Sequence, residues 1–195
     1  MTDSINALKG FISALKMPIS QEAMGEFEKI WTKTSFKRKT IITNPDITEK
    51  HLYFVIDGVQ RIYYLDDFGR EATIIFSYTH SFAGVIDSFL LQSPSKYYFE
   101  TLTKSTLLKA DFKVFKALTE RYRELDYLIQ KLSIYALSGV LERMVELQCY
   151  SSEEKFKSLL KRSPHLLNQI PQKYLANYLG IDPTNFSKLI NLIKI

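Results

Sequence analysis

One stretch near the carboxyl end constrains the fold more than any other: residues 172–191, QKYLANYLGIDPTNFSKLIN. Its apolar residues fall at helical spacing on both sides of Gly180, which predicts two short helices with one buried seam. Gly180 suits the positive φ of a sharp interhelical turn, and the small Ala176 lets a second helix cross closely. Asp182 is a strong N-cap, and Pro183 fits the first position of the second helix. The stretch therefore predicts a helix-turn-helix.

The second helix of this motif has an outer face of polar side chains. Phe186 and Leu189 turn inward at helical spacing, so Lys188 and its polar neighbours face outward. A helix-turn-helix places its second helix in the DNA major groove, where lysine and asparagine bond base edges, and its first helix near backbone phosphates. The predicted DNA-binding residues are Gln172, Lys173, Thr184, Asn185, Ser187 and Lys188. The alternative is a purely structural helix pair with a solvated polar face.

The formal net charge of +5 is concentrated at the same end of the chain. From Ser151 onward, seven Lys and Arg residues, Lys194 among them, stand against three Asp and Glu residues. A basic end on a nearly neutral body is typical of a protein that binds a polyanion. Small basic domains are also common, so the charge supports the motif without establishing DNA binding.

The composition indicates the cellular compartment and argues against disulfide bonds, iron–sulfur clusters and metal sites. With 46% hydrophobic residues, a 195-residue chain can bury packed cores. Cys149 is the only cysteine, so neither an internal disulfide nor an iron–sulfur cluster is expected. His51, His80 and His165 are scattered, so no metal site is expected. Without a signal peptide or a run that could span a bilayer, the sequence predicts a cytoplasmic protein with no membrane partner and no cofactor.

The first half of the chain changes from helical to β periodicity. Residues 1–31 predict two helices broken at Pro18. Strand signals follow at HLYFVIDG (51–58), VQRIYYL (59–65), the hairpin LDDFGREATIIFS (65–77), and residues 81–85, 97–102 and 106–110. Many short strands at this spacing predict a double-sheet jelly roll, or β-roll.

From residue 112 the pattern is helical. Apolar residues alternate by three and four, the spacing of a coiled-coil seam that joins two copies. The predicted dimer interface is Leu118, Tyr122, Leu125, Ile129, Leu132, Ala136 and Gly139. A second apolar set comprises Leu128, Ile134, Tyr135 and Leu141. Because such a stripe also suits packing within one subunit, we expect one face to serve the partner and the other the chain's own domain.

Beyond this helix, Ser151 and Glu154 predict a capping box that starts a new helix. The chain then divides into three predicted domains: residues 1–111 (β-roll with N-terminal helices), 112–149 (long dimerisation helix) and 150–195 (helix-turn-helix domain). We see no internal repeat and no low-complexity linker.

This order of parts resembles the Crp/Fnr superfamily of bacterial transcription regulators over essentially the whole chain. HLYFVIDGVQRIYYLDDFGRE is similar to the core of the family's cyclic-nucleotide-binding-like roll, and residues 142–189 are similar to the hinge and DNA-binding end of a Bacteroidetes-type branch. The resemblance implies an α+β fold with a winged-helix-like C-terminal domain. It also implies a homodimer that reads a pseudo-palindrome in double-stranded DNA, in major grooves roughly 34 Å apart, with RNA polymerase as a further partner.

The chain departs from the family where cyclic AMP would bind. In cyclic-AMP-binding members, the loop after the mid-roll strand offers a glutamate and an arginine to the nucleotide. Here Gly84 is kept, Val85 takes the glutamate's place, and Ser95-Lys96 stand near the expected Arg-Ser pair. Without the carboxylate and a bidentate arginine, we expect no response to cyclic AMP. The candidate ligand-binding residues Gly84, Val85, Ser95 and Lys96 are left for some other, unknown small-molecule effector.

Two other functions compete with that of a DNA-binding regulator. A cupin-like enzyme would need clustered His and Glu ligands, which are absent, so no enzymatic activity is expected. A dimeric small-molecule-sensing or signalling β-roll protein with a vestigial DNA-binding domain predicts no basic face around Lys173 and Lys188. Constitutive DNA binding and effector-controlled DNA binding are equally compatible with the sequence.

Overall fold

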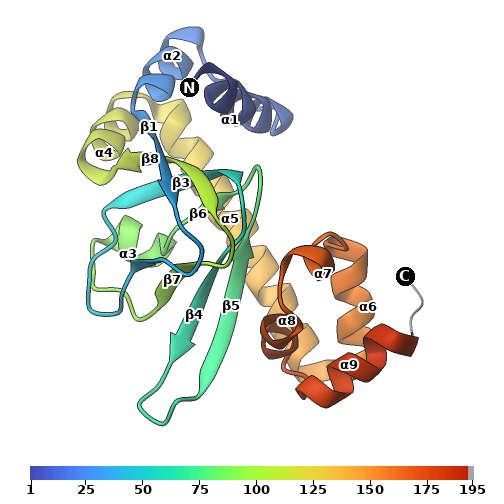
Figure 1. Cartoon of the computed structure of the whole chain (residues 1–195). Helices are drawn as coiled ribbons and strands as arrows, with labels where there is room; N and C mark the ends of the chain where they lie inside the picture. Colours follow the sequence, from blue (N-terminus) through green and yellow to red (C-terminus); the bar gives the residue numbers. More distant parts are fainter. Residues whose placement is uncertain (193–195) are drawn as a thin grey trace.

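The computed structural model describes residues 1–192, so Lys194 lies outside the described residues. The fold is α+β, as predicted: a double-sheet roll is followed by a long helix and a helical head, the name used here for residues 150–192 (Figure 1). The helices are α1 (Thr2–Ala14), α2 (Gln21–Lys29), α3 (Ile86–Leu91), α4 (Phe112–Arg121), α5 (Arg123–Cys149), α6 (Ser152–Arg162), α7 (Leu166–Gln169), α8 (Gln172–Leu179) and α9 (Pro183–Leu192). The described part of the head has no strand that would form a wing.

The roll consists of two four-stranded antiparallel sheets, β1-β8-β3-β6 and β2-β7-β4-β5. The strands are β1 (Trp31–Phe36), β2 (Ile41–Thr43), β3 (His51–Asp57), β4 (Gln60–Leu65), β5 (Glu71–Ser77), β6 (Phe82–Ala83), β7 (Tyr98–Thr101) and β8 (Ser105–Asp111). Strands β3 to β8 lie where the sequence predicts them. The sequence did not predict β1, because WTKTSF is largely exposed and polar and becomes a strand by pairing with β8.

Strand β3 is buried on both faces, which explains why its sequence is a continuous apolar run. Between the sheets lies a core of Tyr53, Val55, Ile62, Ala83, Val85, Phe99 and Leu107. On the other side of β3 and β8, Leu52, Phe54, Leu108 and Ala110 pack in one cluster with residues of α1, α2, α4 and α5. The helices therefore cover the outer face of one sheet and leave the outer face of the second sheet for the head.

The helical region after the roll is divided at Tyr122, which has extended backbone angles (φ −117°, ψ 101°). Residues 112–149 therefore form two helices, α4 and α5, where the sequence predicted one. Leu125 and Leu128 of α5 are fully buried against the roll. Further along, α5 continues behind the roll to the head (Figure 1). One helix thus belongs to the roll at its start and to the head at its end.

The head begins with the predicted capping box. Glu154 N donates to Ser151 Oγ (3.3 Å), and Ser151 N donates to Glu154 Oε2 (2.8 Å). Inside the head, the rings of Phe156 and Phe186 meet edge to face with centroids 5.4 Å apart. None of the helices in residues 1–192 is both long and apolar enough to cross a membrane.

Candidate nucleic-acid interface

Helices α8 and α9 form the predicted helix-turn-helix, and the residues of its turn have their predicted roles. Gly180 ends α8 in the left-handed region, at φ +59°. Asp182 Oδ1 accepts hydrogen bonds from the backbone N–H groups of Thr184 (2.9 Å) and Asn185 (3.1 Å). Helix α9 starts at Pro183, where a missing N–H costs nothing. The local sequence therefore sets the angle between the two helices.

The outer face of α9 is exposed. Phe186 is fully buried and Leu189 is 8% exposed, so these two side chains hold α9 on the head core. All four DNA-binding residues predicted on this helix, Thr184, Asn185, Ser187 and Lys188, are exposed. A polar helix face of this kind fits the width of a major groove.

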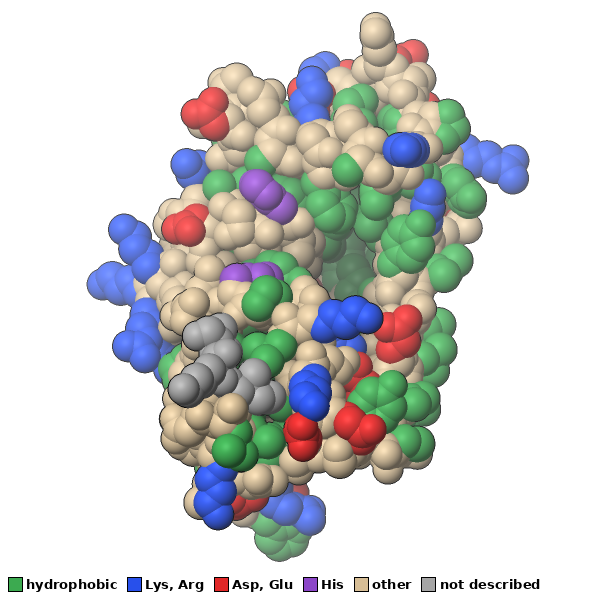
Figure 2. All heavy atoms as spheres, turned by 90° about the vertical axis from the view of Figure 1, so that its right-hand side faces the viewer, with side chains coloured by type: hydrophobic (Ala, Val, Ile, Leu, Met, Phe, Trp, Pro, Cys, Tyr) green, Lys and Arg blue, Asp and Glu red, His purple; other side chains and the backbone are tan. Residues whose placement is uncertain are grey.

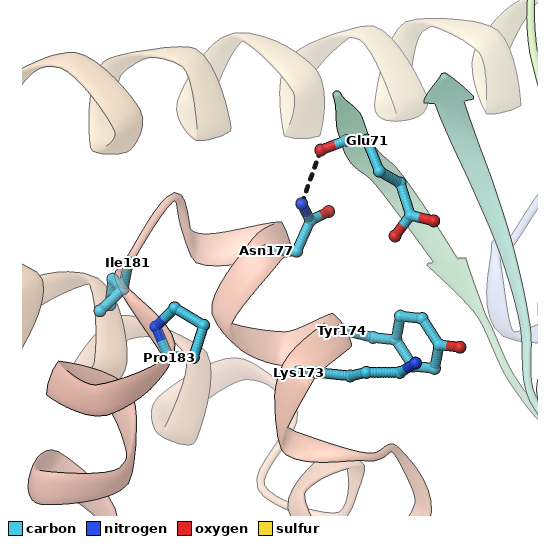
Figure 3. A pocket seen from close by; sticks show the side chains of 6 residues that line it. All are labelled: Glu71, Lys173, Tyr174, Asn177, Ile181 and Pro183. Atoms are coloured by element: carbon cyan, nitrogen blue, oxygen red, sulfur yellow. Dashed lines mark hydrogen bonds between the residues drawn. The ribbon is translucent and has the colours of Figure 1, made fainter. Parts of the chain in front are cut away.

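The two predicted residues on α8, Gln172 and Lys173, are also exposed. Lys173 lies beside the start of α9, because Lys173 and Pro183 line one open cavity of about 320 Å³. The complete lining is Glu71, Lys173, Tyr174, Asn177, Ile181 and Pro183 (Figure 3). The structure thus brings the starts of α8 and α9 together, and it adds an acidic residue from β5 that the sequence did not predict.

Helix α8 is attached to the edge strand of the second sheet through Asn177. Its side-chain Oδ1 accepts a hydrogen bond from Thr73 N, and its Nδ2 donates to Glu71 O, both at 2.6 Å (Figure 3). Strand β5 is at the edge of its sheet, where backbone groups lack a neighbouring strand. The Asn177 amide supplies the missing partners and joins the head to the roll.

A cluster of charged side chains on the roll continues this contact. Arg61 is 3% exposed; its Nε donates to Glu100 Oε2 (2.8 Å) and its Nη1 to Glu71 Oε1 (2.7 Å). The Arg61 guanidinium lies 4.1 Å from the centre of the Tyr174 ring of α8. Lys39 Nζ donates to Glu100 Oε1 (3.2 Å) and to the Tyr174 hydroxyl. Burial opposes ionisation of Tyr174, but the neighbouring lysines outweigh burial and lower the pKa of its phenol.

A second buried ion cluster joins the end of α5 to the head. Glu146 accepts hydrogen bonds from Arg143 (3.0 Å), Arg162 (3.0 Å) and Ser158 (2.6 Å). Arg143 also donates to the carbonyl of Tyr178 on α8. These hydrogen bonds join the last turns of α5 to the head and to helix α8 of the helix-turn-helix.

The predicted ligand-binding residues differ in burial: Val85 and Ser95 are buried, and Lys96 is exposed. Gly84 has φ +110°, and Val85 is 1% exposed within the core between the sheets. Ser95 is buried, and its Oγ accepts from Tyr97 N (2.9 Å) and donates to Tyr97 O (2.7 Å). Lys96 is exposed. Val85 thus serves the roll core and Ser95 its own loop. In residues 1–192, no group of three His, Cys, Asp or Glu residues is placed to hold a metal ion.

Most of the predicted dimer seam faces its own subunit. Leu118 lies on α4 and is 9% exposed, and Leu125 of α5 is fully buried. Tyr122, Ile129 and Leu132 pack partly buried against the same cluster, while only Ala136 and Gly139 are exposed. Leu118 and Leu125 are therefore covered by their own subunit, since a stripe at this spacing also suits packing within one subunit, and the dimer interface itself stays a prediction.

The opposite face of α5 is apolar and exposed. Ile134, Leu137, Leu141 and Met144 are between 50% and 64% exposed and follow one another at spacings of three and four residues. Hydrophobic side chains gather along the right-hand edge of the molecule, where α5 runs, in Figure 2. A solvent-exposed heptad face of this kind fits a coiled-coil partner.

Comparisons with known proteins identify the fold. The sequence matches no protein-family model and no curated protein. The structure is similar to FixK2 from Bradyrhizobium japonicum, with a TM-score of 0.76 and 15% identity over 84% of each chain. It is also similar to a putative transcriptional regulator of the Crp/Fnr family from Eubacterium rectale (TM-score 0.70, 16% identity, 90% of this chain and 84% of the other). The Thermus thermophilus catabolite activator protein follows, with a TM-score of 0.57, 18% identity and the same coverage.

The chain has the Crp/Fnr fold. Within this fold the helix-turn-helix follows the long helix, as the sequence predicted. What the sequence did not predict is the contact of Tyr174 and Asn177 with Lys39, Arg61 and Glu71. These partners are separated by about a hundred residues, and no local pattern connects them.

Proposed function

We propose that this protein is a DNA-binding transcriptional regulator and a member of the Crp/Fnr superfamily. The observation that carries the proposal is the outer face of α9, whose Thr184, Asn185, Ser187 and Lys188 are all exposed on a helix fixed by buried Phe186. The Crp/Fnr fold supports it, since two of the compared structures are described as a transcriptional regulator and an activator protein. Lys188 is the residue we assign to a base edge, and Gln172 and Lys173 to phosphates.

The regulator acts as a homodimer on a pseudo-palindromic operator, with RNA polymerase as a further partner. The exposed apolar face of α5 supports dimerisation, because water disfavours a long apolar helix face without a cover. Two copies related by a twofold axis would present two α9 helices to successive major grooves. The protein works without cyclic AMP; an effector of another kind would use the roll.

The test of DNA recognition begins with duplexes selected by the purified protein from a random-sequence pool. Lys188→Ala should weaken binding of the selected duplex by about 1–3 kcal/mol and relax its sequence preference, if Lys188 contacts a base edge. The matched control is Lys157→Ala, which removes the same charge from the exposed side of α6. Fluorescence anisotropy measures both affinities.

Two results would contradict the proposal. Equal losses for Lys188→Ala and Lys157→Ala would mean that α9 makes no specific contact. Failure to enrich any duplex would favour the alternative of a signalling β-roll protein with a vestigial DNA-binding domain.

A further inference from the structure

Helix α9 runs along the outer edge of the head (Figure 1) and has one line of exposed polar side chains, here called the reading line: Thr184, Lys188 and Asn191. We propose that Asn191 is a base-reading residue, which selects an adenine in each operator half-site, one or two base pairs from the base bound by Lys188. The inference rests on the proposed function. It adds a specificity residue that the sequence did not predict and names the base that this residue takes.

The reading line points directly away from the head core. Successive residues of an α-helix are about 100° apart, so Thr184, Lys188 and Asn191 fall within about 60° of one another. On the opposite side of the helix, the buried side chains of Phe186 and Leu189 pack in the head core. Asn191 therefore faces the same way as Lys188, about 4.5 Å further along the helix axis.

The spacing of the reading line suits neighbouring base pairs. Base pairs stack about 3.4 Å apart, so a separation of about 4.5 Å along the helix spans one to two of them. The recognition helix of a homeodomain reads bases with residues spaced i, i+3, i+4 and i+7. The same spacing relates Thr184, Ser187, Lys188 and Asn191. In the major groove an asparagine amide pairs with adenine, because its oxygen accepts from N6 and its nitrogen donates to N7.

The other groups on α9 are less suited to reading this base. Asp182 Oδ1 already accepts hydrogen bonds from the N–H groups of Thr184 and Asn185, so the start of α9 is a poor site for a phosphate. Asn185 lies only about 40° from the buried Leu189, at the side of the helix, where the wall of the groove presents phosphates. Asn191, and not Asn185, is thus the asparagine that faces the bases.

The test compares the same chemical change at two positions of one helix. The wild type, Asn191→Ala and the control Asn185→Ala each select duplexes from a random-sequence pool. Asn191→Ala should lose the preference for one adenine in each half-site and bind the wild-type duplex about five- to hundredfold more weakly. Asn185→Ala should keep every base preference and weaken all duplexes alike, as expected for a phosphate contact. Alanine favours an exposed helix position, so neither change should impair folding.

Modified duplexes test the contact atom by atom. Purine in place of the selected adenine removes the N6 amino group, and 7-deazaadenine removes N7. Each change should weaken binding by the wild type, because one of two hydrogen bonds is lost, and should not weaken binding by Asn191→Ala any further. The register is tested with Lys188→Ala. The base preference that this variant relaxes should lie one or two base pairs from the adenine that Asn191 reads.

Three results would overturn the inference: Asn191→Ala keeps every wild-type base preference, it loses the preference for a base other than adenine, or Asn185→Ala loses the adenine instead. Failure of the proposed function looks different, because the wild type itself would then enrich no duplex. If the wild type enriches a duplex and Asn191→Ala enriches the same one, DNA recognition stands and only the role of Asn191 is refuted.

Discussion

Glu146 shows, at the scale of one residue, how α5 is tied to the head. It lies almost completely buried and accepts hydrogen bonds from Arg143, Arg162 and Ser158. Burial opposes ionisation, but the hydrogen bonds from Arg162, Ser158 and Arg143 outweigh it, so the pKa of the Glu146 carboxyl lies below its ordinary value. The carboxylate therefore stabilises the folded chain only while it is ionised.

Glu146→Gln should lower the free energy of unfolding by about 2–4 kcal/mol near neutral pH, because the buried Arg143 and the exposed Arg162 both lose their countercharge. A carboxyl with a lowered folded pKa contributes stability above its unfolded pKa and loses it as the pH falls toward the folded value. The difference from the wild type should therefore shrink in acid. Urea unfolding near pH 7 and near pH 4 measures both values.

The control for this variant is Glu153→Gln, at an exposed pair with Lys157 on α6, where the change should cost close to nothing. An equal loss of stability for Glu146→Gln at both pH values would show that packing, and not charge, explains the effect.

At the scale of the element, α5 has two apolar faces, and only the structure distinguishes their uses. Its first turns are buried on the roll through Leu125 and Leu128. On the opposite side, Ile134, Leu137, Leu141 and Met144 are exposed. Both sets have the spacing of a heptad, so sequence periodicity alone gives each face equal weight. We assign the exposed face, which the rest of the subunit does not cover, to the dimer partner.

Leu141→Glu should weaken the dimer about a hundredfold, because it would bury an unpaired charge in the seam. Ala136→Glu, on the face that the sequence first suggested, should leave the dimer intact. Sedimentation equilibrium measures the monomer–dimer constant of each variant. If Ala136→Glu weakens the dimer and Leu141→Glu does not, the dimer interface is the face that contains Leu132, Ala136 and Gly139.

At the scale of the whole molecule, the roll is packed around Val85, one of the predicted ligand-binding residues. Val85 belongs to the core between the sheets, with Tyr53 and Phe99. Nearby, Glu49 is buried; burial raises the pKa of its carboxyl, although hydrogen bonds from Thr43 and the backbone oppose the rise. The loop is thus held by the chain's own side chains.

Cyclic AMP should leave the thermal unfolding temperature of the protein unchanged. A ligand that binds only the folded state stabilises it by about 2.7 kcal/mol at a hundredfold excess over its dissociation constant, which a thermal scan detects easily. Val85 offers no carboxylate for the ribose, and Lys96 offers no bidentate guanidinium for the phosphate. A reproducible rise in unfolding temperature with cyclic AMP would contradict this expectation.

The sequence by itself determined the parts whose causes are local. The turn at Gly180, the Asp182 cap and the capping box of Ser151 and Glu154 are confirmed because neighbouring residues satisfy one another's backbone groups. Strands β3 to β8 were predictable for the same reason, since their apolar runs and turn residues lie within a few positions. The exposed polar face of α9 follows from helical spacing alone.

Tertiary structure decided everything that depends on partners distant in the chain. β1 is a strand because β8 lies beside it, and Leu125 is a core residue because the roll covers it. The contact of α8 with the roll is the extreme case: Tyr174 and Lys39 are 135 positions apart, and Asn177 and Glu71 are 106 apart. A sequence pattern can show that a side chain is suited to burial or to hydrogen bonding. Which distant residue it contacts depends on the tertiary structure.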